Sequence, residues 1–410
     1  MKKSLSNLMN LAHRAKSITF NTQTILEQAR ELKKQNRLND AINLLEETNN
    51  KKEDGRIVHL LSHYLLEAAD YQRIVELPTI SQYNPRNFAI AHALLANSDN
   101  QTVCLKGHQP LHHAAYICMV KDEEDIILWN LVWHYALGFR KFFIINNLST
   151  DNTEGQIKFF EKICSDTHVF VLHDPVIAHF QSKKTTGACR FVLSLWPDID
   201  WIALVDADEF LCPTQALHTI LANFPDHTDA IVVSKSVYHL VSSDSLNASE
   251  LFFKRIQHRK PISHISNKVI VRANLHLSVS QGNHRIFDHN NEEIKNYIGS
   301  PKLSYREFPI RSREHFLRKI INGGKAIAEA KQQGFNQVGG THWEALYKNI
   351  YLKEGEEGMN RKFSAILTKN SKEASLFDPL PLEAMINALE CTAKEDLLTR
   401  LHHPHPIDQK

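Results

Sequence analysis

From residue 114 onward, short apolar runs alternate with stretches of helical spacing, and this alternation restricts the fold more than any other feature of the chain. The apolar runs are rich in β-branched and aromatic residues, as strands are. They lie at 114–120, 141–147, 168–174, 201–207 and 229–238. Helical periodicity occupies the intervals at 125–137, 154–164 and 181–195. Runs that are apolar on both faces and separated by helices indicate a mainly parallel sheet with helices on both sides, so we predict an α/β fold.

The segment before this alternation has only helical spacing. Apolar residues keep a helical period over 22–100, with a break at 36–39. "DAINLL" at 40–45 and "DYQRIVEL" at 70–77 lie about one helix-pair repeat of roughly 34 residues apart. This spacing weakly resembles tetratricopeptide repeats, and a small helical bundle explains it equally well. We expect these helices to bind a protein partner or to mediate oligomerisation.

A change in sequence character at 106–110 separates the helical segment from the alternating one. After 238 the pattern loosens into an alternating meander at 268–280, and helical spacing returns at 313–333. We therefore predict three parts, a helical unit at 1–108, an α/β domain at 109–345 and a helical extension at 346–410.

Charge and cysteine content exclude several classes of protein. The formal net charge is +2 with scattered Lys and Arg, so the basic stripe of a nucleic-acid-binding protein is missing. The 6 cysteines form no CxxC pair and are typical of buried thiols in a reducing compartment. No apolar stretch follows the basic N-terminus, and no run approaches the roughly 20 apolar residues that cross a bilayer. We expect a cytoplasmic protein whose membrane association is at most peripheral, at the inner face of the membrane.

The strongest chemical signal is a cluster of acids at the end of one apolar run. The run at 201–205 leads directly into Asp206, Asp208 and Glu209. Carboxylates at the edge of a core are costly unless a counter-charge neutralises them. Mg²⁺ or Mn²⁺ on a diphosphate supplies that charge, because these cations take carboxylate and phosphate oxygens. Strand alternation points Asp206 and Asp208 the same way, which favours chelation, whereas helix capping by Asp208 or Glu209 is the alternative.

Polar residues also follow two other predicted strands, at the edge where open α/β sheets bind ligands. In the acidic stretch 121–125, Asp122 and Glu123 either cap the next helix or accept hydrogen bonds from a base or ribose. The polar loop at 146–153 contains Asp151 and, taken alone, is a turn that caps a helix.

Three motifs in order along 115–212 resemble the glycosyl transferase family 2 group of GT-A-fold enzymes. They are "VKDEEDI", "LGFRKFFIINNLSTDNT" and "DIDWIALVDADEFLCP". The resemblance implies a Rossmann-like mixed sheet of the GT-A type that binds nucleotide-diphospho-sugars. It also implies that Asp122, Glu123 and Asp151 line the nucleotide pocket.

The same resemblance implies a metal site. Asp206 would lie near the ribose and the metal, and Asp208 would bind the metal on the diphosphate. "NKVIVRANLHLSVSQGNH" resembles a segment with a further metal-binding His, matched by His284, although His276 and His289 are nearby alternatives. A neutral imidazole suits Mn²⁺.

Two further segments resemble the family less closely. Gln181 and Arg190 lie where the family carries a helix before its metal-binding strand, and they are either donor contacts or helix-surface residues. Lys319, in "FPIRSREHFLRKIINGG", matches a segment whose cation would close over the leaving diphosphate. The chain departs from the family at Trp129-Asn130, where a Glu-Trp pair is usual, and at Asn152, where a turn glycine is usual.

The resemblance implies a metal-dependent, inverting glycosyltransferase with a UDP- or GDP-sugar donor and a glycan or glycolipid acceptor. Bacterial surface polysaccharide or lipopolysaccharide synthesis is the expected setting. A carboxylate would deprotonate the acceptor hydroxyl. Asp244 lies where the family keeps an acceptor-side loop, and Glu307 and Glu344 are the alternatives.

Two other functions compete with this one. A non-catalytic interaction protein with a degenerate sugar-nucleotide domain would not need the intact acidic strand end. A haloacid-dehalogenase-like phosphatase also uses two aspartates in a DxD pattern, but on the first strand of its domain, whereas here the pattern follows several strands.

Overall fold

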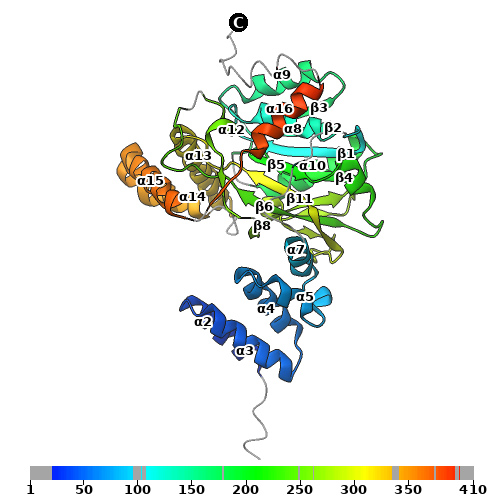
Figure 1. Cartoon of the computed structure of the whole chain (residues 1–410), viewed down its shortest axis with the longest axis vertical. Coiled ribbons are helices and arrows are strands. Elements are labelled where there is room, and N and C mark those ends of the chain that lie inside the picture. Colours follow the sequence, from blue (N-terminus) through cyan, green and yellow to red (C-terminus); the bar gives the residue numbers. More distant parts are fainter. Residues whose placement is uncertain are drawn as a thin grey trace, which may run out of the picture. The chain divides into compact units, whose positions relative to one another are not determined.

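The computed structural model describes residues 21–95, 103, 108–177, 180–247, 250–261, 263–334, 341–373, 375–392 and 397 (Figure 1). The chain divides into two compact units, Met1–Phe88 and Ala89–Lys410, and the boundary falls within helix α7. Each unit buries apolar side chains of its own.

The smaller unit is helical, as the sequence predicts. Its helices are α2 (Thr22–Lys34), α3 (Leu38–Lys51), α4 (Gly55–Glu67), α5 (Tyr71–Glu76), α6 (Ile80–Tyr83) and the start of α7 (Pro85–Leu95). Side chains cap the starts of three of them, because Asn21, Asp54 and Asp70 accept hydrogen bonds from the first-turn amides of α2, α4 and α5.

The larger unit is built on an 8-stranded mixed sheet with the order β3-β2-β1-β4-β8-β6-β11-β5. The strands are β1 (Leu111–Val120), β2 (Phe139–Asn146), β3 (His168–His173), β4 (Trp201–Asp206), β5 (Glu209–Pro213), β6 (Ala230–Val237), β8 (Ser263–Arg272) and β11 (Tyr297–Glu307). β1 pairs in parallel with both β2 and β4, and the strand order reverses there. β8 is antiparallel to β4 and β6, and β5 is antiparallel to β11.

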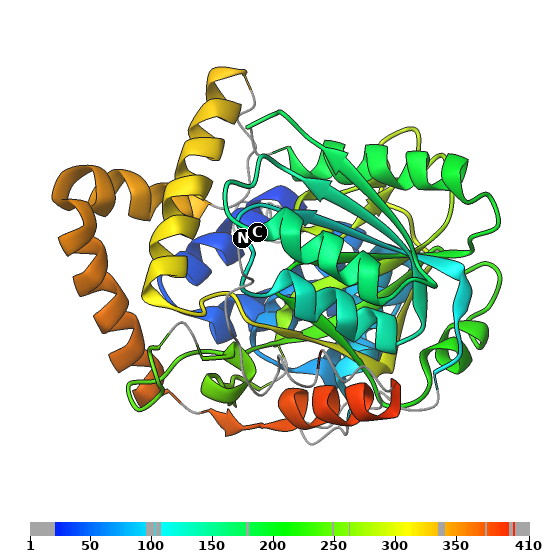
Figure 2. The same cartoon turned by 90° about the horizontal axis from the view of Figure 1, so that it is seen from above.

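Helices cover both faces of this sheet. α8 (Ile127–Ala136) and α9 (Thr153–Ile163) lie on one face and α10 (Gln181–Leu195) on the other, as Figure 2 shows. Tyr116 and Cys118 of β1 join the core formed with α8 and α9. The prediction of an α/β fold with a mixed sheet, an N-terminal helical unit and C-terminal helices is therefore confirmed.

Three strands of the sheet, β5, β8 and β11, lie outside the runs from which the sequence predicts it, and of these only β8 overlaps the predicted meander at 268–280. β5 begins directly after the acidic strand end, and β11 contains Gly299, Ser300 and Pro301, which interrupt its apolar pattern. Smaller elements connect the sheet: α11 (Leu217–Ala222), α12 (Phe252–Arg255), β7 (His258–Arg259), β9 (Ser278–Val279), η1 (Gln281–Asn283) and β10 (Ile286–Phe287).

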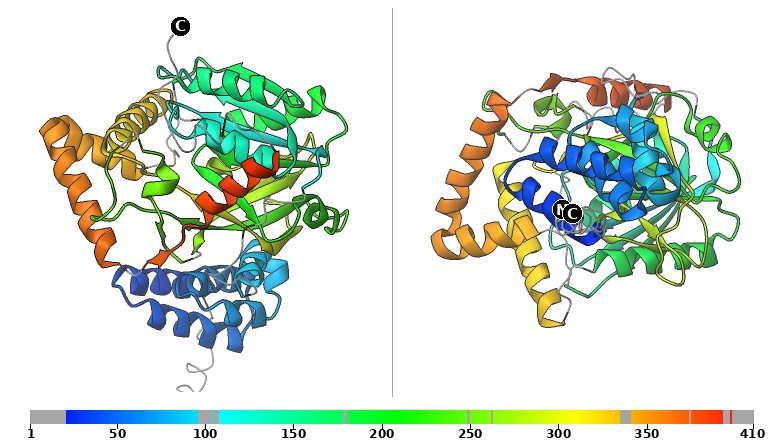
Figure 3. Two further views of the ribbon diagram at one scale, coloured as in Figure 1. Left: turned by 45° about the horizontal axis from the view of Figure 1, so that its top comes forward. Right: turned by 90° about the horizontal axis from the view of Figure 1, so that it is seen from below.

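The C-terminal part of the chain is mostly helical. It contains α13 (Arg313–Gln332), α14 (Thr341–Leu346), η2 (Tyr347–Tyr351), α15 (Leu352–Lys372), β12 (Leu376–Phe377) and α16 (Leu380–Thr392). β12 pairs with β7, and α16 lies against α8, far from it in sequence (Figures 1 and 3). Among the described residues, no helix combines the length and apolarity needed to cross a membrane.

Candidate active site at the strand ends

A cavity of about 460 Å³ lies at the ends of β1 and β4, between α10, the η1 turn, α13 and α14. It brings together most of the site residues predicted from the sequence. These are Asp122, Glu123, Gln181, Asp206, Asp208, His284 and Lys319, with the alternative base Glu307. Because β1 and β4 flank the point where strand order reverses, the cavity has the position in which open α/β sheets bind ligands.

Two predicted donor-site residues do not line the cavity. Asp151 accepts hydrogen bonds from Thr153 N at 3.0 Å and from Glu124 N at 3.2 Å, so it fixes the loop before α9. Arg190 is exposed on α10. Asp151 therefore supports the loops next to Asp122 and Glu123. Arg190 is a helix-surface residue, the alternative to a donor contact.

Two candidate bases also lie outside the cavity lining. Asp244 Oδ2 accepts from Val241 N at 2.8 Å, and its Oδ1 lies 3.8 Å from His258 Nδ1. Glu344 forms ion pairs with Lys331 and Lys348.

The acidic motif forms the turn between β4 and β5. Asp206 is the last residue of β4, and Ala207 and Asp208 form the turn, so strand alternation does not extend to Asp208. Asn130 of α8 holds this turn, since its amide donates to the carbonyls of Ala207 at 2.9 Å and Glu209 at 2.8 Å. The turn, and not the strand, therefore directs Asp208 into the cavity. Because Glu209 begins strand β5, it is not a helix cap.

Each aspartate of the motif is paired with a lysine from a distant element. Lys268 Nζ of β8 lies 2.5 Å from Asp206 Oδ2, and Lys319 Nζ of α13 lies 2.7 Å from Asp208 Oδ2. Although burial opposes ionisation, the Lys319 ammonium keeps the pKa of Asp208 well below its usual range. Asp208 is thus anionic, and both motif carboxylates are paired with cationic groups.

Gln181 connects the motif to the loop that carries His284. Its Nε2 donates to Asp206 Oδ1 at 3.0 Å, and its Oε1 accepts from Gly282 N at 3.0 Å. Gly282 has φ +77°, and a Cβ there would lie 2.4 Å from His284 Nε2, so only glycine fits this turn. His284 Nδ1 bonds to the carbonyl of Asn267, which can only accept. Nδ1 therefore carries a proton, and in the neutral ring the lone pair is then on Nε2, the tautomer of a metal-binding imidazole.

Asp122 sits at the end of β1 with a positive φ of 54°. Its Oδ1 accepts from Thr150 N at 2.7 Å and its Oδ2 from Asn322 Nδ2 at 2.7 Å. Burial raises the pKa of Asp122, but the Thr150 amide, Lys121 and Asn322 outweigh it and lower the pKa overall. A left-handed backbone in an aspartate held on both oxygens marks a strained, fixed position in the cavity wall.

Glu123 belongs to a buried ion cluster below the cavity. The fully buried Arg311 bonds to Glu123 and, through Nε at 2.6 Å, to Asp125. Burial lowers the pKa of Arg311, but Asp125 and Glu123 outweigh it and keep Arg311 cationic. This cluster ties the β1–α8 loop to the segment before α13.

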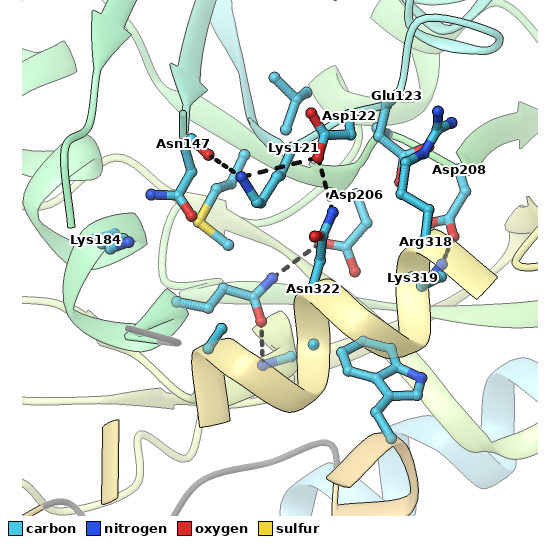
Figure 4. Close-up of a pocket in the computed structure, with 18 of the residues that line it drawn as sticks. Lys121, Asp122, Glu123, Asn147, Lys184, Asp206, Asp208, Arg318, Lys319 and Asn322 are labelled. Atoms are coloured by element: carbon cyan, nitrogen blue, oxygen red, sulfur yellow. Dashed lines mark hydrogen bonds and ion pairs between the residues drawn. The ribbon is translucent and has the colours of Figure 1, made fainter. Parts of the chain in front are cut away.

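The cavity has a cationic side as well as an acidic one. Figure 4 shows Arg318, Lys319 and Asn322 on α13 facing the strand-end acids, with Lys121 beside Asp122 and Lys184 on the opposite side. Lys184 pairs with Asp174 at 2.5 Å, and Lys121 Nζ donates to the carbonyl of Leu148 at 2.8 Å.

Apolar side chains complete the walls. Ile177 and Phe180 line the cavity beside α10, and Trp343 lines it beside α13. Gly323 makes room for the indole, because a Cβ there would lie 2.9 Å from Trp343 Cε3. Flat apolar surfaces next to convergent charges are typical of pockets for mixed polar and apolar ligands.

The residues present fit a divalent cation that is shared with a ligand. Among the described residues, no group of three or more His, Cys, Asp or Glu side chains is arranged to hold a metal alone. However, Asp206, Asp208 and the Nε2-lone-pair tautomer of His284 line one cavity. Mg²⁺ and Mn²⁺ commonly take one or two carboxylates and complete their coordination with phosphate oxygens and water.

Sequence reasoning did not assign roles to several residues of this site. Lys268 stands in the segment "NKVIVR" that carries the family resemblance, so a signal was present for it. Arg311, Arg318 and Asn322 come from the loop and helix around Lys319, where charge alone does not separate buried from exposed positions. Trp343 lines the cavity from α14, which no sequence pattern connects with the strand ends.

Comparisons with known proteins add little to this geometry. No family model and no curated protein matches the chain. Among solved structures it is similar to the mannosyltransferase PcManGT from Pyrobaculum calidifontis in complex with GDP-Man and Mn²⁺, with 12% identity and a TM-score of 0.31, covering 78% of this chain and 90% of that chain. Similarity at this level says nothing about activity, so the functional conclusion depends on the site itself.

Proposed function

We propose that this chain is a glycosyltransferase that transfers a sugar from a nucleotide-diphospho-sugar with the help of a divalent cation. The observation that carries the proposal is the placement of Asp206 and Asp208 at the strand-order reversal, in one cavity with Arg318 and with Lys319, which pairs with Asp208. Acids that bind a cation and cations that bind phosphate are both needed to hold a metal–diphosphate, and the cavity offers them next to one another.

Asp208 and His284 would hold the Mn²⁺ or Mg²⁺, with Asp206 between the metal and the ribose. A bound cation would stabilise the negative charge of the departing diphosphate. Lys319 and Arg318 of α13 would bind the diphosphate oxygens and support the same charge. Gln181 would hold Asp206 and the loop that carries His284 in a fixed position relative to each other.

The nucleoside would lie toward the end of β1. Asp122 and Glu123 line that part of the cavity, with Asn322 donating to Asp122. Carboxylates there can accept hydrogen bonds from base or ribose groups, while Ile177 and Phe180 offer apolar contact to a planar base. UDP- and GDP-sugars both satisfy this chemistry.

The finer parts of the proposal rest on the family resemblance. They are inversion at the anomeric carbon, a glycan or glycolipid acceptor, a cytoplasmic location with peripheral membrane contact, and a role in bacterial surface polysaccharide or lipopolysaccharide synthesis. The N-terminal helices would bind a partner or mediate oligomerisation. The domain limits at 108/109 and 345/346 likewise stay predictions.

The decisive experiment is a screen of UDP- and GDP-sugars for Mn²⁺-dependent hydrolysis, measured as nucleoside diphosphate release. We expect at least one donor to be cleaved, and Asp208→Ala to remove this activity. Asp226→Asn, an exposed aspartate outside the cavity, is the matched control and should behave as wild type. If calorimetry shows no Mn²⁺-dependent binding of any nucleotide sugar, the enzyme proposal fails and a non-catalytic interaction protein becomes the better reading.

A further inference from the structure

A chain of alternating charges connects two sides of the cavity through the protein interior. Lys268 Nζ lies 2.5 Å from Asp206 Oδ2 and 3.2 Å from Glu209 Oε2. Lys235 Nζ lies 3.2 Å from Glu209 Oε1 and 3.1 Å from Glu307 Oε1. Glu209 is 0% exposed, so the third acid of the motif is the buried centre of this chain.

Glu307 is the last member of this row of alternating charges, and it lines the cavity. It is the last residue of β11, opposite Glu209 of β5 and beside Val237 of β6. Its side chain is 17% exposed and lines the cavity, whereas Lys235 behind it is 7% exposed. The carboxylate is therefore fixed from behind and accessible from the cavity.

The other cavity carboxylates are each engaged by a hydrogen-bond or ion-pair partner. Asp122 accepts hydrogen bonds on both oxygens, and Glu123 is held by the buried Arg311. Asp206 and Asp208 pair with lysines and belong to the proposed cation site. Within the described part of the chain, no ion pair besides that with Lys235 reaches Glu307.

The surroundings of Glu307 also suit a proton acceptor. Burial raises the pKa of Glu307, and although Lys235 opposes this shift, nearby Asp208 adds to it, so the pKa stays above its usual value. The charged groups around it are Lys235 of β6, Glu209 of β5, Asp208 of the turn and Lys319 of α13. A base is most effective when its conjugate acid has a pKa near the working pH, which favours a raised carboxyl over a lowered one.

We propose that Glu307, and not Asp244, is the general base that accepts the proton of the acceptor hydroxyl. This inference rests on the proposed glycosyltransferase function and adds the acceptor side to it. The O–H proton moves to the Glu307 carboxylate while the acceptor oxygen forms a bond to the anomeric carbon. The bond from that carbon to the diphosphate oxygen breaks, and the nucleoside diphosphate leaves with the electron pair. Lys235, held by Glu209, is a positioning residue that fixes the Glu307 carboxylate at the cavity wall.

The test separates donor binding from turnover in Glu307→Gln, a variant of nearly equal shape. The probes are Mn²⁺ with UDP or GDP for binding by calorimetry, and the nucleotide sugar that wild type hydrolyses for turnover, with water as the acceptor. We expect binding within about twofold of wild type, and kcat lower by about 10²- to 10⁴-fold with an unchanged KM for the donor. Glu307→Asp should regain part of the lost rate. The control is Glu161→Gln, an exposed glutamate of α9, which should keep the wild-type rate.

Failure of the base assignment and failure of the proposed glycosyltransferase function give different outcomes in this experiment. Retained nucleotide binding shows that the Glu307→Gln site is folded, and a loss of kcat then supports the base. If Glu307→Gln turns over normally while Asp244→Asn does not, Asp244 is the base and the inference is wrong. If the wild-type protein binds no nucleoside diphosphate, the proposed function fails and the inference fails with it.

Discussion

The side-chain amide of Gln181 donates to Asp206 Oδ1 at 3.0 Å, while its carbonyl oxygen accepts from Gly282 N at the same distance. One residue at the start of α10 thus holds both the acidic turn and the loop that carries His284. The two ends of its amide are not interchangeable, because a carboxylate needs the NH₂ group and a backbone N–H needs the oxygen.

Gln181→Glu should weaken binding of Mn²⁺ with a nucleoside diphosphate by about 10- to 100-fold, the range seen for residues that orient metal ligands. The new carboxylate would face Asp206 and repel it. Gln181→Met, which removes both hydrogen bonds without adding charge, should have a smaller effect. Calorimetry measures both, with the exposed Gln82→Glu as the charge control. Equal affinities for wild type and Gln181→Glu would remove this residue from the site.

Metal and nucleotide should stabilise the protein together more than either does alone. Asp206 and Asp208 are already paired with lysines, so a cation alone gains little, whereas diphosphate oxygens complete its coordination. A ligand at 100 times its Kd stabilises the folded state by about 2.7 kcal/mol, which raises Tm by several degrees. Thermal melts with Mn²⁺, UDP or GDP, and both together test this, and EDTA should reverse the shift. A full shift with Mn²⁺ alone would contradict it.

Arg311→Met should lower the free energy of unfolding by about 3–5 kcal/mol, because it leaves buried carboxylates without their cation. Arg311 is fully buried and bonds to both Glu123 and Asp125. The control is Arg361→Met on α15, whose ion pairs with Glu354 and Glu357 are exposed and should matter far less. Urea denaturation gives both values. A loss no larger than that of the control would show that the cluster carries little stability.

The fully buried His134 should make the protein sensitive to mild acid. Burial lowers the pKa of His134 from 6.5 to about 4. The unfolded chain then binds more protons between these values, so the free energy of unfolding falls as the pH falls through this window. At about 1.4 kcal/mol per pKa unit, the loss reaches about 3 kcal/mol. Denaturation of wild type and His134→Gln from pH 7 to pH 4 measures it, and parallel pH profiles would contradict the expectation.

The sequence predicts the parallel half of the sheet well, because β1, β2 and β4 are mostly buried on both faces and form continuous apolar runs. The runs at 114–120 and 201–207 correspond closely to β1 and β4. β11 is harder to predict, since Gly299 and Pro301 break its pattern and only the neighbouring strands make it a strand.

Some residues of the candidate site can likewise be predicted from the sequence, and others cannot. Asp122, Asp206 and Asp208 are visible because acids that directly follow apolar runs are unusual in any sequence. Lys235 is not, since it stands inside a strand where a lone cation gives no hint that a buried carboxylate faces it, and Lys268 is indicated only by the family resemblance of its segment. The loop position of Asp244 favours it over the alternatives Glu307 and Glu344, whereas the cavity is lined by Glu307. The pairing of β11 with β5 and β6 that places Glu307 there is information that a linear pattern does not contain.

The alternating chain from Asp206 to Glu307 has a consequence for how such a sequence can diverge. Replacing Lys235 alone by a neutral residue removes one of the two ion-pair partners of the buried Glu209. Replacing Glu209 alone leaves the buried Lys235 and Lys268 without the carboxylate that they share. Neutral drift at these positions must therefore proceed through paired exchanges of opposite charge. After a loss of the chemistry, single changes would therefore be tolerated at the cavity surface before they are tolerated among these buried charges.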